Sequence, residues 1–283
     1  VDRAVLLLGD AAGLLRDQSG LAPTVVVRIS AWSDRLGDLR RASGMMIAVP
    51  AGTTKTGPVP AFFLGCTEVS QGEYARFLDE LGALIDQLAG DERKAKLATK
   101  LGDLVVPTDE VDEMLRRRGR LPSPELPVDR TTWWQAAAYA LWYGLALPTK
   151  AEWALAAFGD QHQYEFPWGR EWKMDDSCRN IGNRLVPAAS GGLSWRSTGN
   201  KAVHHLAGNA AEWLQAAPGA SSGELAGGRC QDSLSDAKRR AAGEDFHEAS
   251  LTKSLDGFGF RAILRPREFL GSDFPSGRLA NGR

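Results

Sequence analysis

The sequence has few cysteines, and they do not form a recognisable pair. Only Cys66, Cys178 and Cys230 occur in 283 residues, and no two of them have the C-x-x-C spacing typical of metal and redox sites. Such cysteines are typical of reduced, mostly buried thiols. The sequence also lacks N-x-S/T glycosylation sequons. Together these absences predict a cytoplasmic protein.

Other missing features argue against several classes of function. No apolar run is long enough to span a membrane, so no membrane association is expected. The 34 basic and 35 acidic residues nearly cancel, so nucleic acid is not an expected partner. No H-E-x-x-H, G-x-G-x-x-G, P-loop or G-x-S-x-G pattern occurs. The sequence starts at Val1 rather than Met, which is consistent with a processed end or a longer natural protein.

Composition divides the chain into three parts. Residues 1–44 carry a Leu-rich helical stretch and a β-branched stretch, which predict an N-terminal arm or the end of a preceding domain. A first layer of the main core is the alternative for this segment. Residues 45–266 are interpreted as the main domain, with a polar, helical insertion at 86–125. Residues 267–283 are interpreted as a polar C-terminal tail.

Helix starts are marked by S/T-x-x-E/Q capping boxes. In such a box the hydroxyl accepts a hydrogen bond from the third helical amide, and the Glu or Gln side chain returns to the cap amide. The boxes are Ser70 with Glu73, Thr132 with Gln135, and Thr149 with Glu152.

After Gly159 the chain is rich in Gly, Asn, Ser and Trp, which predicts irregular structure and short strands.

The order of short motifs resembles the formylglycine-generating-enzyme, or sulfatase-modifying-factor, family. The most specific motifs are L-P-T-K-A-E-W at 147–153, G-N-A-A-E-W at 208–213 and G-F-G-F-R at 257–261. Each motif is weak alone, but their shared order is specific. The resemblance implies an α+β, C-type-lectin-like fold with little regular secondary structure, short antiparallel strands and several capped helices. Further matching stretches are residues 49–53, 63–70, 127–136, 166–169 and 227–228.

The resemblance also exposes a departure. In that family, two cysteines after the Gly-Gly pair bind copper and carry out the oxidation, whereas here Cys230 is the single cysteine after Gly227 and Gly228. A soft Cu(I) ion needs a thiolate pair, so no copper and no catalytic residues are expected. The alternative is a diverged metal- and O2-dependent oxidoreductase, related to the formylglycine-generating and sulfoxide-synthase enzymes, that uses Cys230 and His247. The sequence favours a non-enzymatic role and leaves the question open.

The resemblance further implies a structural calcium site. Family members often bind Ca²⁺ through oxygen ligands, which suit this hard cation. The alternative is that Asn209 and Glu212 brace a tight turn without a metal. The matching positions in this chain are Asn180, Ile181, Asn209 and Glu212.

Residues 229–256 form the predicted ligand surface. C-type-lectin-like folds tend to expose ligand-binding loops here, and the similar variable proteins of diversity-generating retroelements vary this region. We interpret the chain as a non-catalytic module that binds a protein or other ligand, in a larger signalling or defence protein or a retroelement-diversified bacterial protein. An ordinary solvated loop is the alternative. The predicted ligand-binding residues are Arg229, Asp232, Asp236, Lys238, Asp245, His247 and Lys253.

Overall fold

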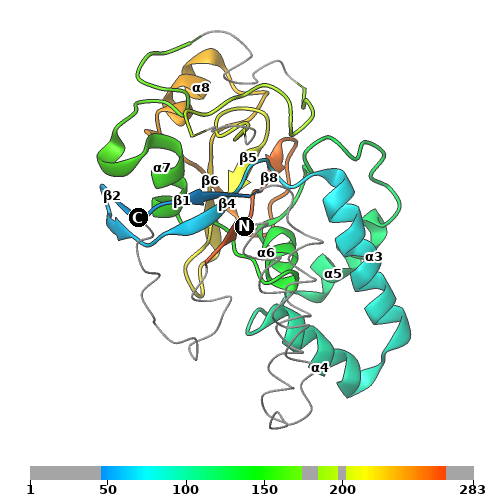
Figure 1. Cartoon of the computed structure of the whole chain (residues 1–283). Helices are drawn as coiled ribbons and strands as arrows, with labels where there is room; N and C mark the ends of the chain where they lie inside the picture. The colour runs from blue at the N-terminus through cyan, green and yellow to red at the C-terminus, as the bar shows by residue number, and fades with distance from the viewer. Residues whose placement is uncertain (1–45, 174–183, 197–201, 266–283) are drawn as a thin grey trace, which may run out of the picture.

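The computed structural model describes residues 46–173, 184–196 and 202–265 (Figure 1). The arm predicted for residues 1–44 and the tail predicted for 267–283 lie outside the described residues. Asn180 and Ile181, two of the predicted calcium ligands, also lie outside them. The described part mixes helices with short strands, so the α+β prediction is confirmed.

A small sheet joins the two ends of the described chain. Strand β4 (Phe62–Gly65) lies between β1 (Met46–Val49) and β9 (Ile263–Leu264), and both pairings are antiparallel. Side chains in β4 alternate between buried and half-buried, as expected for a strand packed on one face. Strands β2 (Gly52–Thr54) and β3 (Gly57–Val59) form a separate antiparallel hairpin.

A second sheet carries the C-terminal half of the fold. Its order is β7 (His247–Ser250), β6 (Ser222–Ala226), β5 (Ala211–Trp213) and β8 (Phe258–Gly259). The pairs β5–β6 and β6–β7 are antiparallel, but β5 and β8 are parallel. The prediction of antiparallel strands therefore fails at this one pair. Parallel neighbours need a long crossover, and residues between β5 and β8 provide it.

The helices begin largely where the capping boxes predict. Both hydrogen bonds of the box are present at Ser70, which starts α3 (Gln71–Gln87), and at Thr149, which starts α7 (Lys150–Phe158). At the start of helix α6 (Trp133–Trp142) only one of the two capping-box hydrogen bonds is present, the one that Thr132 Oγ1 accepts from the Gln135 amide.

Among the described residues, no helix has the length and apolar character needed to cross a bilayer.

The box at Thr132 forms only in part, because the Thr132 and Gln135 side chains bind the insertion instead. The predicted insertion contains α4 (Gly90–Leu101) and α5 (Thr108–Arg117). Glu110 on α5 is buried, and its Oε2 accepts from Thr132 Oγ1 at 2.8 Å and from Gln135 Nε2 at 2.9 Å. A long-range polar contact thus replaces the local return bond, and it anchors α5 to the start of α6.

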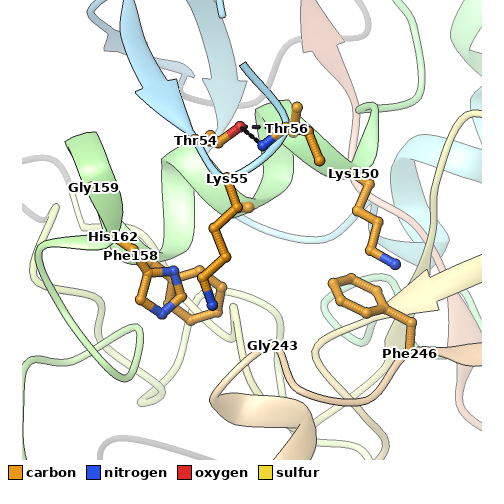
Figure 2. Close-up of a pocket in the computed structure, with 11 residues that line it drawn as sticks. Thr54, Lys55, Thr56, Lys150, Phe158, Gly159, His162, Gly243 and Phe246 are labelled. Atoms are coloured by element: carbon orange, nitrogen blue, oxygen red, sulfur yellow. Dashed lines mark hydrogen bonds between the residues drawn. The ribbon is translucent and has the colours of Figure 1, made fainter. Parts of the chain in front are cut away.

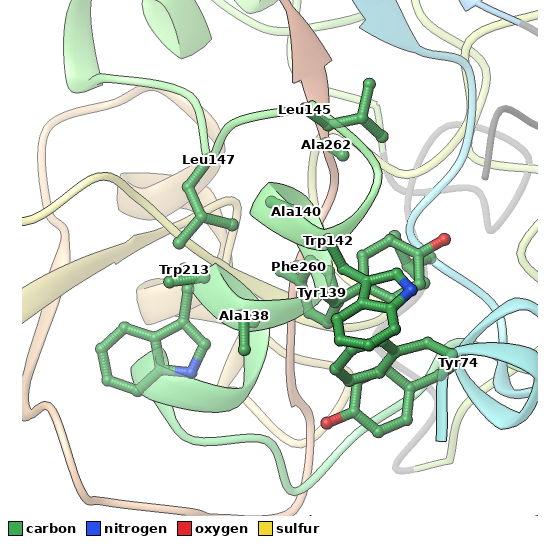
Figure 3. Close-up of a cluster of buried hydrophobic side chains, with 14 of the residues drawn as sticks. Tyr74, Ala138, Tyr139, Ala140, Trp142, Leu145, Leu147, Trp213, Phe260 and Ala262 are labelled. Carbon is green, nitrogen blue, oxygen red and sulfur yellow. The ribbon is translucent and has the colours of Figure 1, made fainter. Parts of the chain in front are cut away.

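An aromatic cluster packs the helical side of the fold (Figure 3). The ring centroids of Tyr139 and Phe260 are 5.3 Å apart, and those of Tyr74 and Phe77 are 5.4 Å apart. Phe77 also meets Trp142 edge-on at 5.6 Å. Edge-to-face pairs of this kind each add about 0.5–1.5 kcal/mol beyond the area they bury. The cluster therefore fixes α3 and α6 against the closing G-F-G-F-R segment.

Loss of a capping box should weaken the fold measurably. We expect Ser70→Ala to lower the free energy of unfolding by about 1 kcal/mol, because the Glu73 amide loses its acceptor. Urea denaturation followed by far-UV circular dichroism measures this change. Thr99→Ala in exposed α4 is the matched control and should be neutral or slightly stabilising, because Ala is the better helix former. Equal stability of Ser70→Ala and the wild type would contradict the assignment.

Candidate functional site

The G-N-A-A-E-W motif forms a buried turn that leads into β5. Asn209 has a left-handed backbone, with φ of 60°, which Asn tolerates better than most residues. Its Oδ1 accepts from the Val186 amide at 3.0 Å, and its Nδ2 donates to Glu68 Oε2 at 3.1 Å. The other Glu68 oxygen accepts from the Ala210 amide at 3.0 Å. Glu68 and Asn209 are both fully buried, so the turn is fixed by polar contacts inside the core.

Glu212 in the same motif forms a buried ion pair with Arg261. Arg261 Nη2 lies 2.7 Å from Glu212 Oε1, and both side chains are fully buried. The remaining guanidinium donors reach the carbonyl oxygens of Gly65 at 2.8 Å and His204 at 2.7 Å. Trp153 Nε1 donates to Glu212 Oε2 at 3.1 Å. The pair therefore joins β5, the end of β4, the chain at His204 and α7.

These contacts bear on the predicted calcium site. Arg261 and Trp153 occupy the Glu212 carboxylate, and the Val186 amide uses the Asn209 side-chain oxygen. This is the arrangement described by the alternative, in which the two residues brace a turn. A calcium ion would have to compete with Arg261 for Glu212, and the other two predicted ligands lie outside the described residues. The calcium site stays a prediction.

Burial gives Glu68 an unusual proton affinity. Desolvation, followed by the nearby Glu212 carboxylate, raises the pKa of Glu68 to about 8, although Arg261 and two hydrogen bonds oppose the shift. A carboxyl with this pKa is largely protonated at neutral pH, which lowers the cost of burying it. Its location beside the ion pair was not indicated by the sequence, because Glu68 and Glu212 are distant along the chain.

Cys230 is buried and lies in an environment that disfavours its thiolate. Its amide donates to the Asn209 carbonyl at 2.8 Å, and its side chain has no exposed surface. Burial raises the pKa of the Cys230 thiol to about 11, and the carboxylates of Asp129, Glu68 and Asp232 act in the same direction. Reactive cysteines have a lowered pKa, so the Cys230 thiol is a poor nucleophile. Cu(I) is held by a pair of thiolates, and Cys230 supplies only one of them.

His247, the second residue of the alternative oxidoreductase site, lies in β7. Its ring meets Phe258 edge-on at 5.1 Å. Burial lowers the pKa of His247, and Arg240 and Arg229 lower it further. Within the described ranges, no group of three or more His, Cys, Asp or Glu side chains is arranged to hold a metal ion. The described part of the chain thus supplies no third ligand to accompany Cys230 and His247.

Segment 229–256 is more ordered than the predicted loops. It contains α8 (Leu234–Ala241) and β7, and only the connections between them are irregular. Ser233 caps α8 because its Oγ accepts from the Asp236 amide at 3.2 Å. Helix α8 departs from the irregular structure and short strands predicted after Gly159, because a Ser-capped start and a basic last turn stabilise this short helix.

The predicted ligand-binding residues divide into paired and exposed groups. Asp232 is buried and accepts from the Arg229 amide at 2.8 Å and from Arg240 Nη1. Asp236 pairs with Arg239, and Asp245 lies 3.6 Å from Arg240 Nε. The structure thus pairs these charges with one another, in the interior at Asp232 and at the surface at Asp236 and Asp245, and leaves Lys238 and Lys253 exposed.

A pocket beside α7 is a feature that the sequence did not predict. It is lined by residues from the β2–β3 turn, α7, the turn after α7 and the segment after α8, including Lys55, His162 and Phe246. Only Gly243 and Phe246 of its lining lie in the predicted ligand segment 229–256. No sequence signal could have found the pocket, because its residues belong to four separate segments.

Comparison with known sequences agrees with this geometry. Residues 37–265 match the profile of the sulfatase-modifying factor enzyme 1-like domain. The chain belongs to this family. The Asn209 turn and the Glu212–Arg261 pair lie in the motifs that carried the resemblance, so the sequence-based assignment to the sulfatase-modifying-factor family is confirmed.

Relatives of this sulfatase-modifying-factor domain include proteins with different names. The chain is 31% identical over 163 residues to serine/threonine-protein kinase Pkn1 of Chlamydia trachomatis, which covers 56% of this chain and 23% of the kinase. It is 32% identical over 148 residues to hercynine oxygenase of Mycobacterium tuberculosis, covering 47% of this chain and 32% of the oxygenase. The matched region is thus at most about a third of the length of each of these two relatives.

A solved structure also shares the fold. PvdO from Pseudomonas aeruginosa superposes with a TM-score of 0.50 over 77% of this chain and 93% of PvdO. The sequences are 15% identical, so this likeness concerns the fold alone. It agrees with the α+β architecture of the described residues.

The buried ion pair gives a direct prediction. Glu212→Gln should lower the free energy of unfolding by about 3–5 kcal/mol, because it leaves the Arg261 guanidinium buried without a counter-charge. Denaturant titration measures this loss. Asp79→Asn removes the partner of Arg118 in an exposed pair, and its effect should be small by comparison. Similar losses for the two variants would show that the buried pair has no special role.

The raised pKa of Glu68 predicts that the stability of the fold depends on pH. Because the folded pKa of about 8 is above the ordinary 4.5, the protonated carboxyl favours the folded state below pH 4.5, and this stabilisation disappears as pH rises through 8. Between pH 6.5 and 8, the free energy of unfolding should fall by up to about 1.4 kcal/mol per pH unit. Urea denaturation across this interval measures the slope.

The matched variants separate Glu68 from other titrating groups. Glu68→Gln should flatten the slope between pH 6.5 and 8, whereas Glu92→Gln on exposed α4 should keep it. Burial lowers the pKa of His205 to about 4, so only the unfolded state binds a proton there near pH 6.5; this opposes the Glu68 slope and fades as pH rises toward 8. An unchanged slope in Glu68→Gln would rule out Glu68 as its source.

Proposed function

We propose that this sulfatase-modifying-factor domain is a non-catalytic binding module that recognises a protein or other ligand through segment 229–256. The observation that carries the proposal is the state of Cys230, the single cysteine after the Gly-Gly pair. Its thiol is buried and its pKa is raised to about 11. A thiol with a raised pKa is a poor nucleophile, and this single thiol does not supply the thiolate pair that Cu(I) needs.

The binding role is assigned to the α8 surface, which we define as the side chains of Leu234, Lys238 and Arg239. Leu234 is 46% exposed, and the exposed Lys238 lies one helical turn from it. Arg239 is exposed as well and pairs with Asp236 on the same helix. An apolar side chain bordered by basic groups suits a protein partner with an acidic border. The internal ion pairs of Asp232 fix the segment that carries this surface.

The relatives bear on this proposal in two ways. Similarity to a serine/threonine-protein kinase supports a place for the domain in a larger signalling protein. Similarity to a hercynine oxygenase favours the second candidate, a metal- and O2-dependent oxidoreductase that uses Cys230 and His247. Diversification of segment 229–256, a structural calcium ion and a cytoplasmic location remain predictions.

The binding proposal is tested with matched charge reversals. A partner is first captured by cross-linking to the wild-type chain and identified, and its affinity is then measured by titration. We expect the Leu234→Asp, Lys238→Glu, Arg239→Glu variant to lose at least about tenfold in affinity, because apolar burial and charge complementarity are both removed. The control is Lys94→Glu, Lys96→Glu on α4, at the other end of the molecule in Figure 1, and it should bind normally.

Two results would contradict the proposal. One is equal partner affinity of the α8 variant and the control. The other is copper or iron near one per chain in freshly purified protein, lost in Cys230→Ser, together with oxygen-dependent turnover of a thiol or a cysteine peptide. The second result would establish the oxidoreductase instead. Elemental mass spectrometry and an oxygen electrode provide these measurements.

A further inference from the structure

A cavity of about 140 Å³ lies on the α7 side of the domain (Figure 2). Its walls come from the turn between β2 and β3, the outer face of α7, the turn that follows α7 and the segment after α8. These segments are brought together by tertiary packing alone. The cavity is separate from the Asn209 turn and from the α8 surface.

The walls of the cavity are largely aromatic and aliphatic. Phe158 is 2% exposed, and the His162 ring packs against it with the centroids 4.5 Å apart. Phe246 lies across the cavity from them in Figure 2, and Ala154 of α7 lines the cavity as well. A side chain at Gly243 would meet the Phe158 ring at 2.7 Å, so glycine is needed there to keep this wall in place.

The turn that presents His162 has a backbone of high energy. Gln161 and His162 have φ values of 53° and 57°, which lie in the left-handed region that non-glycine residues seldom adopt. Two consecutive residues of this kind indicate that the surrounding contacts enforce the turn. The ring of His162 is thereby held against Phe158, at the edge of the cavity.

The charges at the cavity have one sign. Lys55 and Lys150 line it, and none of the lining residues is acidic. Lys150 Nζ lies 3.9 Å from the Phe246 ring centroid and 2.7 Å from Glu224 Oε1, so its charge is partly offset from outside the cavity. Lys55 forms no ion pair within the described part of the chain. Its side chain extends toward His162 and Phe158 in Figure 2.

The ring of His162 is an uncharged neighbour of Lys55 at neutral pH. Burial lowers the pKa of His162, and the Lys55 ammonium lowers it further, while Glu165 acts in the opposite direction. The positive charge available to a ligand is therefore that of Lys55, with a smaller contribution from Lys150. His162 adds a polar ring edge rather than a second full charge.

We propose that this cavity binds a small organic anion, with one carboxylate beside Lys55 and a single ring or short alkyl body between Phe158 and Phe246. The volume sets the size of the ligand, because an apolar cavity of about 150 Å³ accommodates one benzene molecule. The basic lining and the aromatic walls together select an anion with an apolar body. This site goes beyond the proposed partner surface and does not depend on it.

Calorimetric titration of the full chain with benzoate tests the proposal. We expect saturable binding that weakens about fivefold in Lys55→Gln, the ratio equivalent to an exposed ion pair of about 1 kcal/mol. Ala154→Leu should abolish binding, because the larger side chain fills the cavity while remaining compatible with the helix. Benzyl alcohol, which has the ring without the charge, should bind more weakly than benzoate.

The controls keep the proposal open to refutation. Lys96→Gln on α4 and the α8 variant should both bind benzoate like the wild type, so failure here is distinct from failure of the partner-binding proposal. Lys55 is exposed, so its variant tests the site even if Ala154→Leu does not fold. Absence of saturable binding, equal affinity in Lys55→Gln, or inorganic phosphate binding as tightly as benzoate would overturn the proposal.

Discussion

The ion pair between Glu212 and Arg261 is the contact on which the described fold depends most. Burying two charges is costly, and the cost is offset only when the geometry is good and the remaining donors are satisfied. Arg261 meets this condition through the carbonyls of Gly65 and His204, and Glu212 through Trp153. A single side-chain pair thereby fixes β5, the end of β4 and α7 relative to each other.

This fixed interior separates the parts of the domain that hold the fold from the parts that can carry function. The Asn209 turn and Glu68 are buried beside the ion pair and have little freedom to change. Two other regions carry the proposed functions: the surface of α8, and the cavity beside α7. Both are built largely from turns and connecting segments, which is where binding sites commonly lie.

Local sequence rules succeeded where the interaction they describe is local. The boxes at Ser70 and Thr149 formed as expected, because both partners lie within one helical turn. The box at Thr132 formed only in part, because buried Glu110 on α5 binds both of its side chains. Segment 229–256 was expected to be loops and contains α8, because Ser233 caps the helix start and basic residues lie in its last turn. The parallel pairing of β5 with β8 had no signal in either strand.

The sequence by itself determined the family, the α+β class and most helix starts, because these depend on motif order and on contacts between near neighbours. Tertiary structure alone decided which charges are internal. Asp232, predicted to bind a ligand, is buried in an ion-pair network, and Glu212, predicted to bind calcium, faces Arg261. Tertiary structure also created the cavity between Lys55, Phe158 and Phe246. Burial and long-range pairing depend on how distant segments pack, and the order of residues along a single segment does not contain that information.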